Sequence, residues 1–193
     1  SRGLGDVYKR QMLEKCLKNN NLIAAIDINT RFTSDNPHWN YINHDSAHVG
    51  EHWEDKKVDL VFFDTVHVKE QVLTETYYWW DHIKEGGLAI YHDTSWHGYR
   101  HHARHRAAGK QPGSSRQGFD RYGGIDWDTP DRAVETFFNV NLNPPERDIN
   151  NNNFVDIYED EYIKVEQNWA FLGLTIVKKK KHFDYKDNQN IDW

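Results

Sequence analysis

Short apolar runs of strand length recur through the first half of the chain. They lie at residues 22–28 ("LIAAIDI"), 39–43 ("WNYIN"), 58–64 ("VDLVFFD") and 87–92 ("GLAIYH"). Runs that are nearly continuously apolar are typical of strands covered on both faces. Residues 70–84 are amphipathic and predict a helix that ends before the Gly86-Gly87 pair. Strands that alternate with helices predict an α/β fold with a parallel sheet.

The second half of the chain has a different pattern. Residues 95–128 are rich in Gly, Arg, His and aromatic residues without a sustained period, and we interpret them as a variable loop or small cap. Thr129-Pro130 has the form of a helix N-cap followed by proline, which predicts a helix to about Val140. Residues 161–167 and 170–178 are two strand-like runs joined by a short link. They predict an antiparallel hairpin at the edge of the sheet.

The two ends of the chain are expected to lie outside this domain. Residues 1–11 ("SRGLGDVYKRQ") have neither helical nor strand periodicity and resemble a translated sequencing adapter, so we interpret them as a non-native segment. An amphipathic pattern from Met12 to Asn19 predicts the end of a helix. We therefore predict one domain over residues 12–179, followed by a polar tail at 180–193 in which the lysines at 178–181 are solvated.

Composition narrows the class of protein. The chain has 193 residues, which suits one domain, and its net charge of -6 argues against general nucleic-acid binding. A single cysteine, Cys16, excludes an internal disulfide and fits a reducing compartment. No apolar stretch is long enough to span a membrane. We expect a cytoplasmic protein that acts on a small molecule, with neither nucleic acid nor membrane as a partner; nothing in the pattern predicts an oligomeric state.

Acidic residues stand at or just past the ends of four predicted strands: Asp27, Asp45, Asp64 and Asp93. In an open parallel sheet, ligands bind beyond the carboxyl ends of the strands. If the strands of Asp64 and Asp93 are neighbours, about 4.8 Å apart, their carboxylates can meet on one cation. Two such carboxylates would repel each other without a cation. The pattern therefore predicts a metal site formed by this pair.

One long segment carries a resemblance to a known family. It reads "VDLVFFDTVHVKEQVLTETYYWWDHIKEGGLAIYHDT", an apolar strand ending in Asp, a nearby His, an amphipathic helix, a Lys-x-Gly-Gly turn and a strand ending in His-Asp. This resembles the second half of class I S-adenosylmethionine-dependent methyltransferases. The most similar group is the metal-dependent small-molecule one, with the macrocin O-methyltransferases and the cephalosporin hydroxylase-like proteins. "AFLGLTIVKK" resembles the family's final strand. The resemblance covers residues 22–94 and 161–179.

The resemblance implies a fold and an activity. The fold would be α/β, Rossmann-like and doubly wound, with a mostly parallel sheet and an antiparallel C-terminal hairpin. The activity would be metal-assisted O-methyl transfer from S-adenosylmethionine to a small hydroxylated metabolite or sugar. Asp27 would bind the ribose hydroxyls of the donor, and Asp45 and Ser46 would lie by the adenine.

The resemblance also implies the reacting site. Asp64 and Asp93 would hold a divalent metal, Mg²⁺, with His92 next to it. The metal would lower the pKa of the substrate hydroxyl and orient its oxygen toward the methyl group. His67 or His97 would take the proton, because an imidazole titrates near neutrality.

One part of the family pattern is missing. The glycine-rich turn after the family's first strand should precede Met12, and Gly3 and Gly5 do not supply it because no apolar strand comes before them. We therefore predict an N-terminally truncated fragment that lacks the first strand. We expect weak donor binding, or none, by these residues alone.

Other interpretations of these residues stay open. The acidic residues at the strand ends and the histidines near them also suit a metal-dependent hydrolase. Its transition metal would be held by Asp64, His67, His92, Asp93 and His97. Asp27 and Asp45 also suit turns and caps after strands, as Asp often does. A non-catalytic fragment is the third alternative.

A second metal-like pattern lies at residues 148–159 ("DINNNNFVDIYE"). It places oxygen-bearing side chains at calcium-loop spacing, with Asn153 where a glycine is expected. Pro144-Pro145 removes the helix that should enter such a loop. We therefore expect an Asn-rich surface loop here rather than a Ca²⁺ site.

Overall fold

The computed structural model describes residues 22–29, 37–54, 56–66, 68–94, 129–142, 152–169 and 173–185. The chain divides into two compact units, the first ending at Val49 and the second beginning at Gly50. The helix end predicted before Asn19 and the cap predicted at 95–128 lie outside the described residues.

The first unit contains two short parallel strands. They are β1 (Ile23–Ile26) and β2 (Trp39–Ile42), paired from Ile23 with Trp39 to Ile26 with Ile42. Both coincide with predicted strands, and most of their side chains are half-buried. Helix α2 (Ser46–Glu51) begins in this unit and was not predicted, because six residues are too few to show a helical period.

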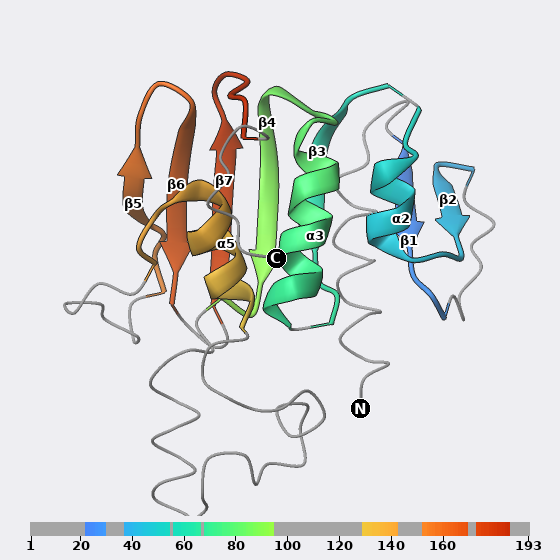
Figure 1. Cartoon of the computed structure of the whole chain (residues 1–193), viewed down its shortest axis with the longest axis horizontal. Helices are drawn as coiled ribbons and strands as arrows, with labels where there is room; N and C mark the ends of the chain where they lie inside the picture. Colours follow the sequence, from blue (N-terminus) through green and yellow to red (C-terminus); the bar gives the residue numbers. More distant parts are fainter. Residues whose placement is uncertain are drawn as a thin grey trace, which may run out of the picture. The chain divides into compact units, whose positions relative to one another are not determined.

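The second unit is built on a five-stranded sheet of order β3-β4-β7-β6-β5 (Figure 1). The strands are β3 (Val58–Phe63), β4 (Ile83–His92), β5 (Val155–Glu159), β6 (Ile163–Asn168) and β7 (Leu174–Lys179). Strands β3 and β4 are parallel, and the pairs β4-β7, β7-β6 and β6-β5 are antiparallel. The predicted α/β class, with parallel strands followed by an antiparallel C-terminal hairpin, is confirmed.

The hairpin of β6 and β7 lies inside the sheet, not at its edge. β7 pairs with β4, and β5 pairs with the far side of β6. The second half of the predicted Asn-rich loop, Val155–Glu159, is thus an edge strand. Its alternating sequence, "VDIYE", is the strand signal that the loop interpretation overlooked. Asp148 and Asn150 of the calcium-like pattern lie outside the described residues.

Two helices of the second unit were predicted from the sequence. Helix α5 (Pro130–Phe138) begins after Thr129, as the N-cap pattern indicated. It ends at Asn139, which is in the left-handed conformation. Helix α3 (Lys69–Trp80) ends well before the predicted Lys84, so that part of the prediction is wrong.

The residues after α3 belong to strand β4 because the glycine pair serves a strand, not a helix end. Val58 of β3 pairs with Ile83, and the register then shifts before Leu60 pairs with Leu88. Gly86 has a φ of 82°, and a Cβ on Gly87 would lie 2.9 Å from the Asp59 carbonyl oxygen. These glycines therefore form an irregularity within β4, where glycine permits a close backbone approach.

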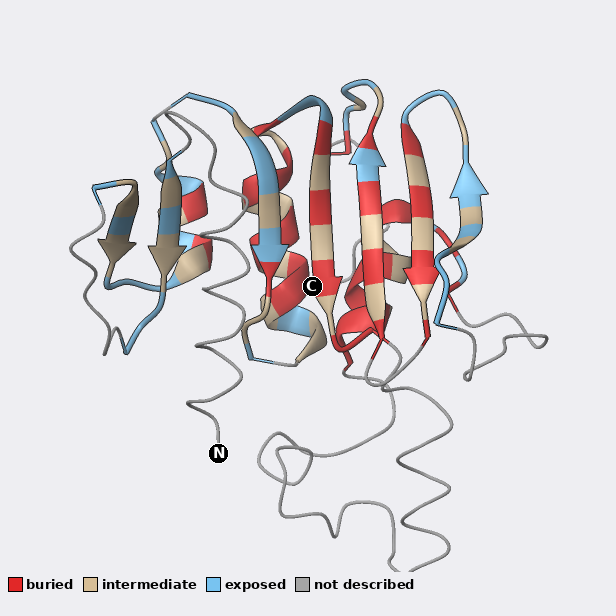
Figure 2. Cartoon of the chain, turned by 180° about the vertical axis from the view of Figure 1, so that it is seen from behind, coloured by how far each residue is buried: buried red, intermediate tan, exposed pale blue. Residues whose placement is uncertain are grey.

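Helices α3 and α5 lie side by side on one face of the sheet (Figures 1 and 2). Buried residues alternate along β4, β6 and β7, so one side of each strand faces these helices. The core under α3 is aromatic: the Trp80 ring lies 4.8 Å from that of Phe138. None of the described helices is long and apolar enough to cross a membrane.

The C-terminal residues are only partly solvated: Lys178 and Lys181 are exposed, as predicted, but Lys179 and Tyr185 are buried. Lys179 is 1% exposed, because the two-residue period of β7 places it on the inward face with Val177 and Thr175. Its Nζ donates to the Trp80 carbonyl oxygen at 2.7 Å. In the predicted polar tail, Tyr185 is buried and its hydroxyl donates to the Tyr77 carbonyl oxygen at 2.6 Å. The domain core therefore extends to at least residue 185.

Candidate functional site

The carboxyl ends of β3 and β4 lie next to each other. The two strands are parallel, and their register places Phe63 opposite Tyr91. The rings of these two residues stack, with centroids 4.7 Å apart and planes 9° from parallel. Because the residue after each of these points to the opposite face of the sheet, Asp64 and His92 emerge together at the strand ends. The predicted neighbourhood of the Asp64 and Asp93 strands is confirmed.

Three side chains converge at these strand ends. The Nδ1 atom of His92 lies 2.8 Å from Oδ1 of Asp93 and 3.3 Å from Oδ1 of Asp64. One ligand atom from each of the three residues lies within 4.8 Å of the others. We call Asp64, His92 and Asp93 the strand-end cluster. From the sequence, we expected a cation to join the carboxylates; in the structure, the imidazole lies between them.

The two carboxylates change the protonation of the imidazole. Hydrogen bonds to Asp64 and then to Asp93 raise the pKa of His92 to about 9, against the opposing effect of burial. His92 is therefore an imidazolium near neutral pH, and its charge offsets part of the charge of the two carboxylates.

The backbone at Asp93 is held in an unusual conformation. Asp93 has a φ of 60°, in the left-handed region that Asp and Asn tolerate better than most residues, and it is 2% exposed. The next residue, Thr94, is fixed from two other strands. Gln167 of β6 donates to its carbonyl oxygen at 3.0 Å, and the Thr175 hydroxyl of β7 donates to its hydroxyl oxygen at 2.7 Å. The sheet thus positions Asp93 through its neighbour.

Sequence reasoning missed these supporting residues. Gln167 and Thr175 are buried polar residues at inward positions of β6 and β7, next to the apolar inward residues Val165 and Val177. A polar residue in the buried half of an alternating strand is the signal that could have identified them.

The Asp64 side of the cluster is supported by helix α3. The Thr65 hydroxyl donates to Oε2 of Glu75 at 2.8 Å, and Gln71 Nε2 donates to Oε1 of the same carboxylate at 2.9 Å. Glu75 is fully buried. This buried carboxylate, in which both oxygens accept hydrogen bonds, holds the turn that follows β3.

The strand-end cluster has a donor set that suits a divalent cation. It combines two carboxylates, the ligands that Mg²⁺ prefers, with one imidazole, a ligand that suits Mn²⁺ and Zn²⁺ better. The three ligand atoms already lie close enough together for one ion, and one of the carboxylates is almost fully buried. A divalent cation would take over the role that the proton on His92 has in this structure, because a metal-binding imidazole must be neutral.

The residues assigned to the methyl donor lie in the first unit and make local contacts. The Asn29 N–H donates to Oδ1 of Asp27 at 2.7 Å, and the His48 N–H donates to Oδ1 of Asp45 at 3.0 Å. Asp45 therefore caps helix α2, and Ser46 is the first residue of that helix. These are the turn and cap roles that the sequence also allowed; donor binding by these residues stays a prediction. His67 and His97 lie outside the described residues.

Part of the chain is similar to one protein family. Residues 10–94 match the family model of a methyltransferase domain, which agrees with the resemblance seen in the sequence. No curated protein matches the chain.

The solved structures that are similar to this chain include three of the MycE methyltransferase from the mycinamycin biosynthetic pathway. One crystal form in complex with Mg and SAH has 17% identity and a TM-score of 0.44, over 83% of this chain and 38% of that one. The complex with Mg, SAH and mycinamycin VI has 15% identity and a TM-score of 0.44, over 89% of this chain and 39% of that one. A second crystal form with Mg and SAH has 16% identity and a TM-score of 0.43, over 84% of this chain and 38% of that one. The chain spans less than half the length of these proteins.

Proposed function

We propose that the protein transfers a methyl group from S-adenosylmethionine to a hydroxyl oxygen of a small metabolite or sugar, a proposal supported by the match of residues 10–94 to the family model of a methyltransferase domain. The observation that carries the proposal is the strand-end cluster, in which Asp64, His92 and Asp93 meet at the carboxyl ends of two parallel strands. Sites of α/β folds lie at such ends, and two carboxylates with an imidazole can hold a cation there.

In the proposed reaction, the methyl group moves from the sulfonium sulfur to the substrate oxygen, whose proton leaves to a base. Asp64, Asp93 and His92 would hold a divalent cation, Mg²⁺, which when bound supplies positive charge that lowers the pKa of the substrate hydroxyl. His67 or His97 would accept the hydroxyl proton. Asp27 would bind the ribose of the donor, and Asp45 with Ser46 would lie by its adenine. The remaining requirement is in-line positioning of the two reactants.

The first experiment tests the metal site. Mg²⁺ and Mn²⁺ are titrated into the wild-type chain and the variants Asp64→Asn and Asp93→Asn by isothermal calorimetry. We expect each substitution to weaken binding by about tenfold or more, since each removes a charged ligand. Asn is chosen at position 93 because it tolerates the left-handed backbone there.

The matched control is Asp59→Asn. Asp59 is an exposed carboxylate of the same strand, β3, and pairs with Lys84 at 2.8 Å. We expect this variant to bind both cations as the wild type does. Equal affinities for all four proteins would contradict the proposed metal site.

The second experiment tests methyl transfer itself. The protein is incubated with methyl-labelled S-adenosylmethionine and a panel of hydroxylated metabolites and sugars. We expect label in a product ether and release of S-adenosylhomocysteine, both reduced in the Asp64→Asn variant. Label transfer that is independent of Asp64 and of divalent cations would contradict the assigned mechanism.

One observation favours a second candidate function. The imidazole of His92 lies between the two carboxylates, and such a mixed set of ligands suits a transition metal that activates water. A metal-dependent hydrolase would bind Zn²⁺ or Mn²⁺ more tightly than Mg²⁺ and would release product from an ester or amide substrate without a methyl donor. The same calorimetric series, run with Zn²⁺, separates the two functions.

A further inference from the structure

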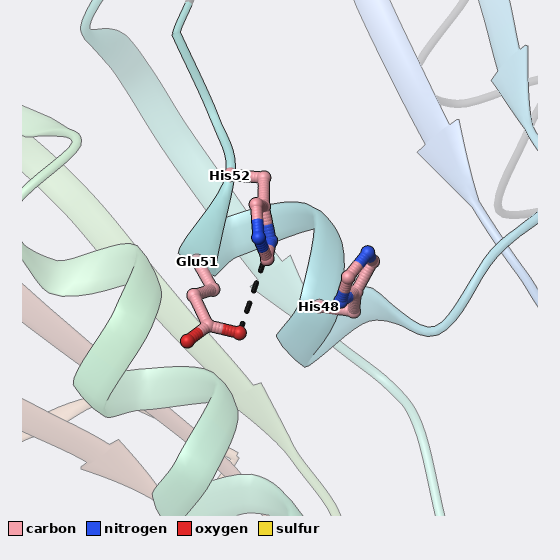
Figure 3. Close-up of side chains that lie close together, drawn as sticks. All are labelled: His48, Glu51 and His52. Carbon is pink, nitrogen blue, oxygen red and sulfur yellow. Dashed lines mark ion pairs between the residues drawn. The ribbon is translucent and has the colours of Figure 1, made fainter.

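Helix α2 carries a second group of metal-ligating side chains, at the spacing His-x-x-Glu-His. His48, Glu51 and His52 are three and four residues apart, so they lie on one side of the helix and the turn that ends it (Figure 3). One ligand atom from each lies within 4.8 Å of the others, and all three residues are exposed. We call them the α2 cluster. His48 and Glu51 belong to α2 and His52 is the next residue after it, so the backbone of one short segment sets their mutual geometry.

The opposite side of α2 is anchored in the fold. Gly50 is buried, and a Cβ at this position would lie 2.7 Å from Nε1 of Trp79, so the helix backbone approaches the indole of α3 closely. The His82 Nε2 atom also lies within hydrogen-bond distance, 2.9 Å, of the Gly50 carbonyl oxygen. These contacts hold the backbone at Gly50, while the three residues of the α2 cluster are exposed.

Neighbouring groups orient the three ligands. The His44 ring stacks on the His48 ring with centroids 4.4 Å apart, which restricts the rotation of the His48 imidazole. The Glu51 carboxylate lies 3.8 Å from Nδ1 of His52, and it also raises the pKa of the nearby Tyr78 hydroxyl, chiefly through its charge. Groups that orient the ligands in this way are usual around protein metal sites.

The chemistry of the ligands selects a class of ion. Two imidazoles and one carboxylate form a set that binds zinc and similar borderline ions, whereas Mg²⁺ and Ca²⁺ prefer oxygen ligands. Zinc sites with three protein ligands keep a further position for water or another ligand. The strand-end cluster has the reverse composition, with two carboxylates and one imidazole.

We propose that His48, Glu51 and His52 form a second metal site, which binds Zn²⁺ or a similar transition-metal ion on the surface of helix α2. The site is independent of the proposed methyl transfer. Since one imidazole comes from α2 and the other from the residue that directly follows it, the bound ion stabilises the end of α2 and raises the melting temperature of the protein.

The experiment counts Zn²⁺ equivalents by calorimetry and follows Co²⁺ binding by visible absorption, on the full chain. The test variants are His48→Ala and His52→Ala, each exposed and each expected to leave the fold intact by circular dichroism. We expect each to remove one equivalent, or to weaken it by about tenfold or more. Glu51→Gln should weaken the same equivalent by a smaller factor, because both imidazoles remain.

Three controls locate the effect. His182→Ala removes another exposed histidine that lies near a carboxylate, Asp81, at 3.7 Å. The double variant His101→Ala/His102→Ala tests the histidine-rich run at 97–106. The double variant Asp64→Asn/Asp93→Asn tests the strand-end cluster.

We expect all three controls to keep the equivalent that His48→Ala removes. An unchanged number and affinity of Zn²⁺ equivalents in both His48→Ala and His52→Ala would overturn the proposed site. Loss of that same equivalent in one of the controls would overturn it as well, by assigning the ion elsewhere.

Discussion

The strand-end cluster and the α2 cluster contain similar side chains but are built in different ways. Asp64 and Asp93 come from two strands joined by helix α3, and a stacked ring pair and buried hydrogen bonds hold their strands and turns. The α2 cluster comes from five consecutive residues and lies in the solvent. The first cluster depends on the tertiary structure of the sheet, and the second depends on one short helix and its anchor.

The difference in burial changes the chemistry. In the strand-end cluster, His92 and a nearly buried Asp93 are held so close that the pKa of the imidazole rises to about 9. A cation that binds there must displace a proton, so we expect slower and more pH-dependent binding than on α2. The two clusters should therefore differ in how cation binding depends on pH.

The largest effect is expected from a change that breaks the sheet side of this comparison. Phe63→Ala removes a buried ring that stacks on Tyr91, and we expect it to lower the free energy of unfolding by about 3–5 kcal/mol. It should also weaken cation binding at the strand ends while the α2 cluster keeps its Zn²⁺ affinity. Urea unfolding and calorimetry measure both. Phe62→Ala, at a ring that is 38% exposed, is the control and should cost much less.

A second prediction concerns a buried charge of the same sheet. Burial lowers the pKa of Lys179 from 10.5 to about 8, with Asp81 and Glu85 raising it and Lys57 lowering it. Between these two pH values the unfolded chain binds more protons than the folded one, so stability should rise with pH across this window. Below pH 8, Lys179 is protonated in both the folded and the unfolded state. The full cost of burying its charge, about 3 kcal/mol of unfolding free energy, is then present.

The variant Lys179→Met tests this dependence. Met keeps most of the side-chain volume and cannot titrate, so the difference in unfolding free energy between wild type and variant should change between pH 7 and pH 10. A constant difference would show that Lys179 keeps its ordinary pKa. Metal binding by the α2 cluster, which uses no residue of the sheet, should be the same in both proteins.

A change at the anchor of α2 addresses the other side of the comparison. A Cβ at Gly50 would collide with the Trp79 ring, so Gly50→Ala should cost about 1–3 kcal/mol in spite of the higher helix propensity of Ala. We expect weaker Zn²⁺ binding on α2, with little change at the strand ends. If thermal unfolding shows a gain in stability instead, then α2 is not held against α3 at this position.

The smallest effect is expected at the helix cap. Asp45→Ala removes the acceptor for the His48 N–H and should cost about 1 kcal/mol, whereas Asp45→Asn should retain the cap. Because His48 belongs to the α2 cluster, Asp45→Ala should weaken Zn²⁺ binding slightly, and Asp45→Asn should not. Equal Zn²⁺ affinities in the two variants would separate the cap from the metal site.

Several parts of the fold and site were predictable because they depend on local patterns. The apolar runs identified β1 to β4. The acidic residues at the ends of these runs indicated a pair formed by Asp64 and Asp93, and strands β3 and β4 are indeed neighbours. The end of α3 was predicted wrongly because a glycine pair has the same sequence signal at a helix end and at an irregularity within a strand. Lys179 was predicted as solvated because a run of lysines hides the two-residue period of β7.

By itself the sequence determined which residues follow strands β3 and β4, and the His-x-x-Glu-His spacing of the α2 cluster, because both follow from the order of residues along the backbone. Only the tertiary structure decided that His92 lies between two carboxylates, and that Gln167 and Thr175 hold the turn after Asp93. These contacts join residues from strands that are distant in the sequence. Their register is set by packing of the whole sheet against α3 and α5, and no local pattern encodes it.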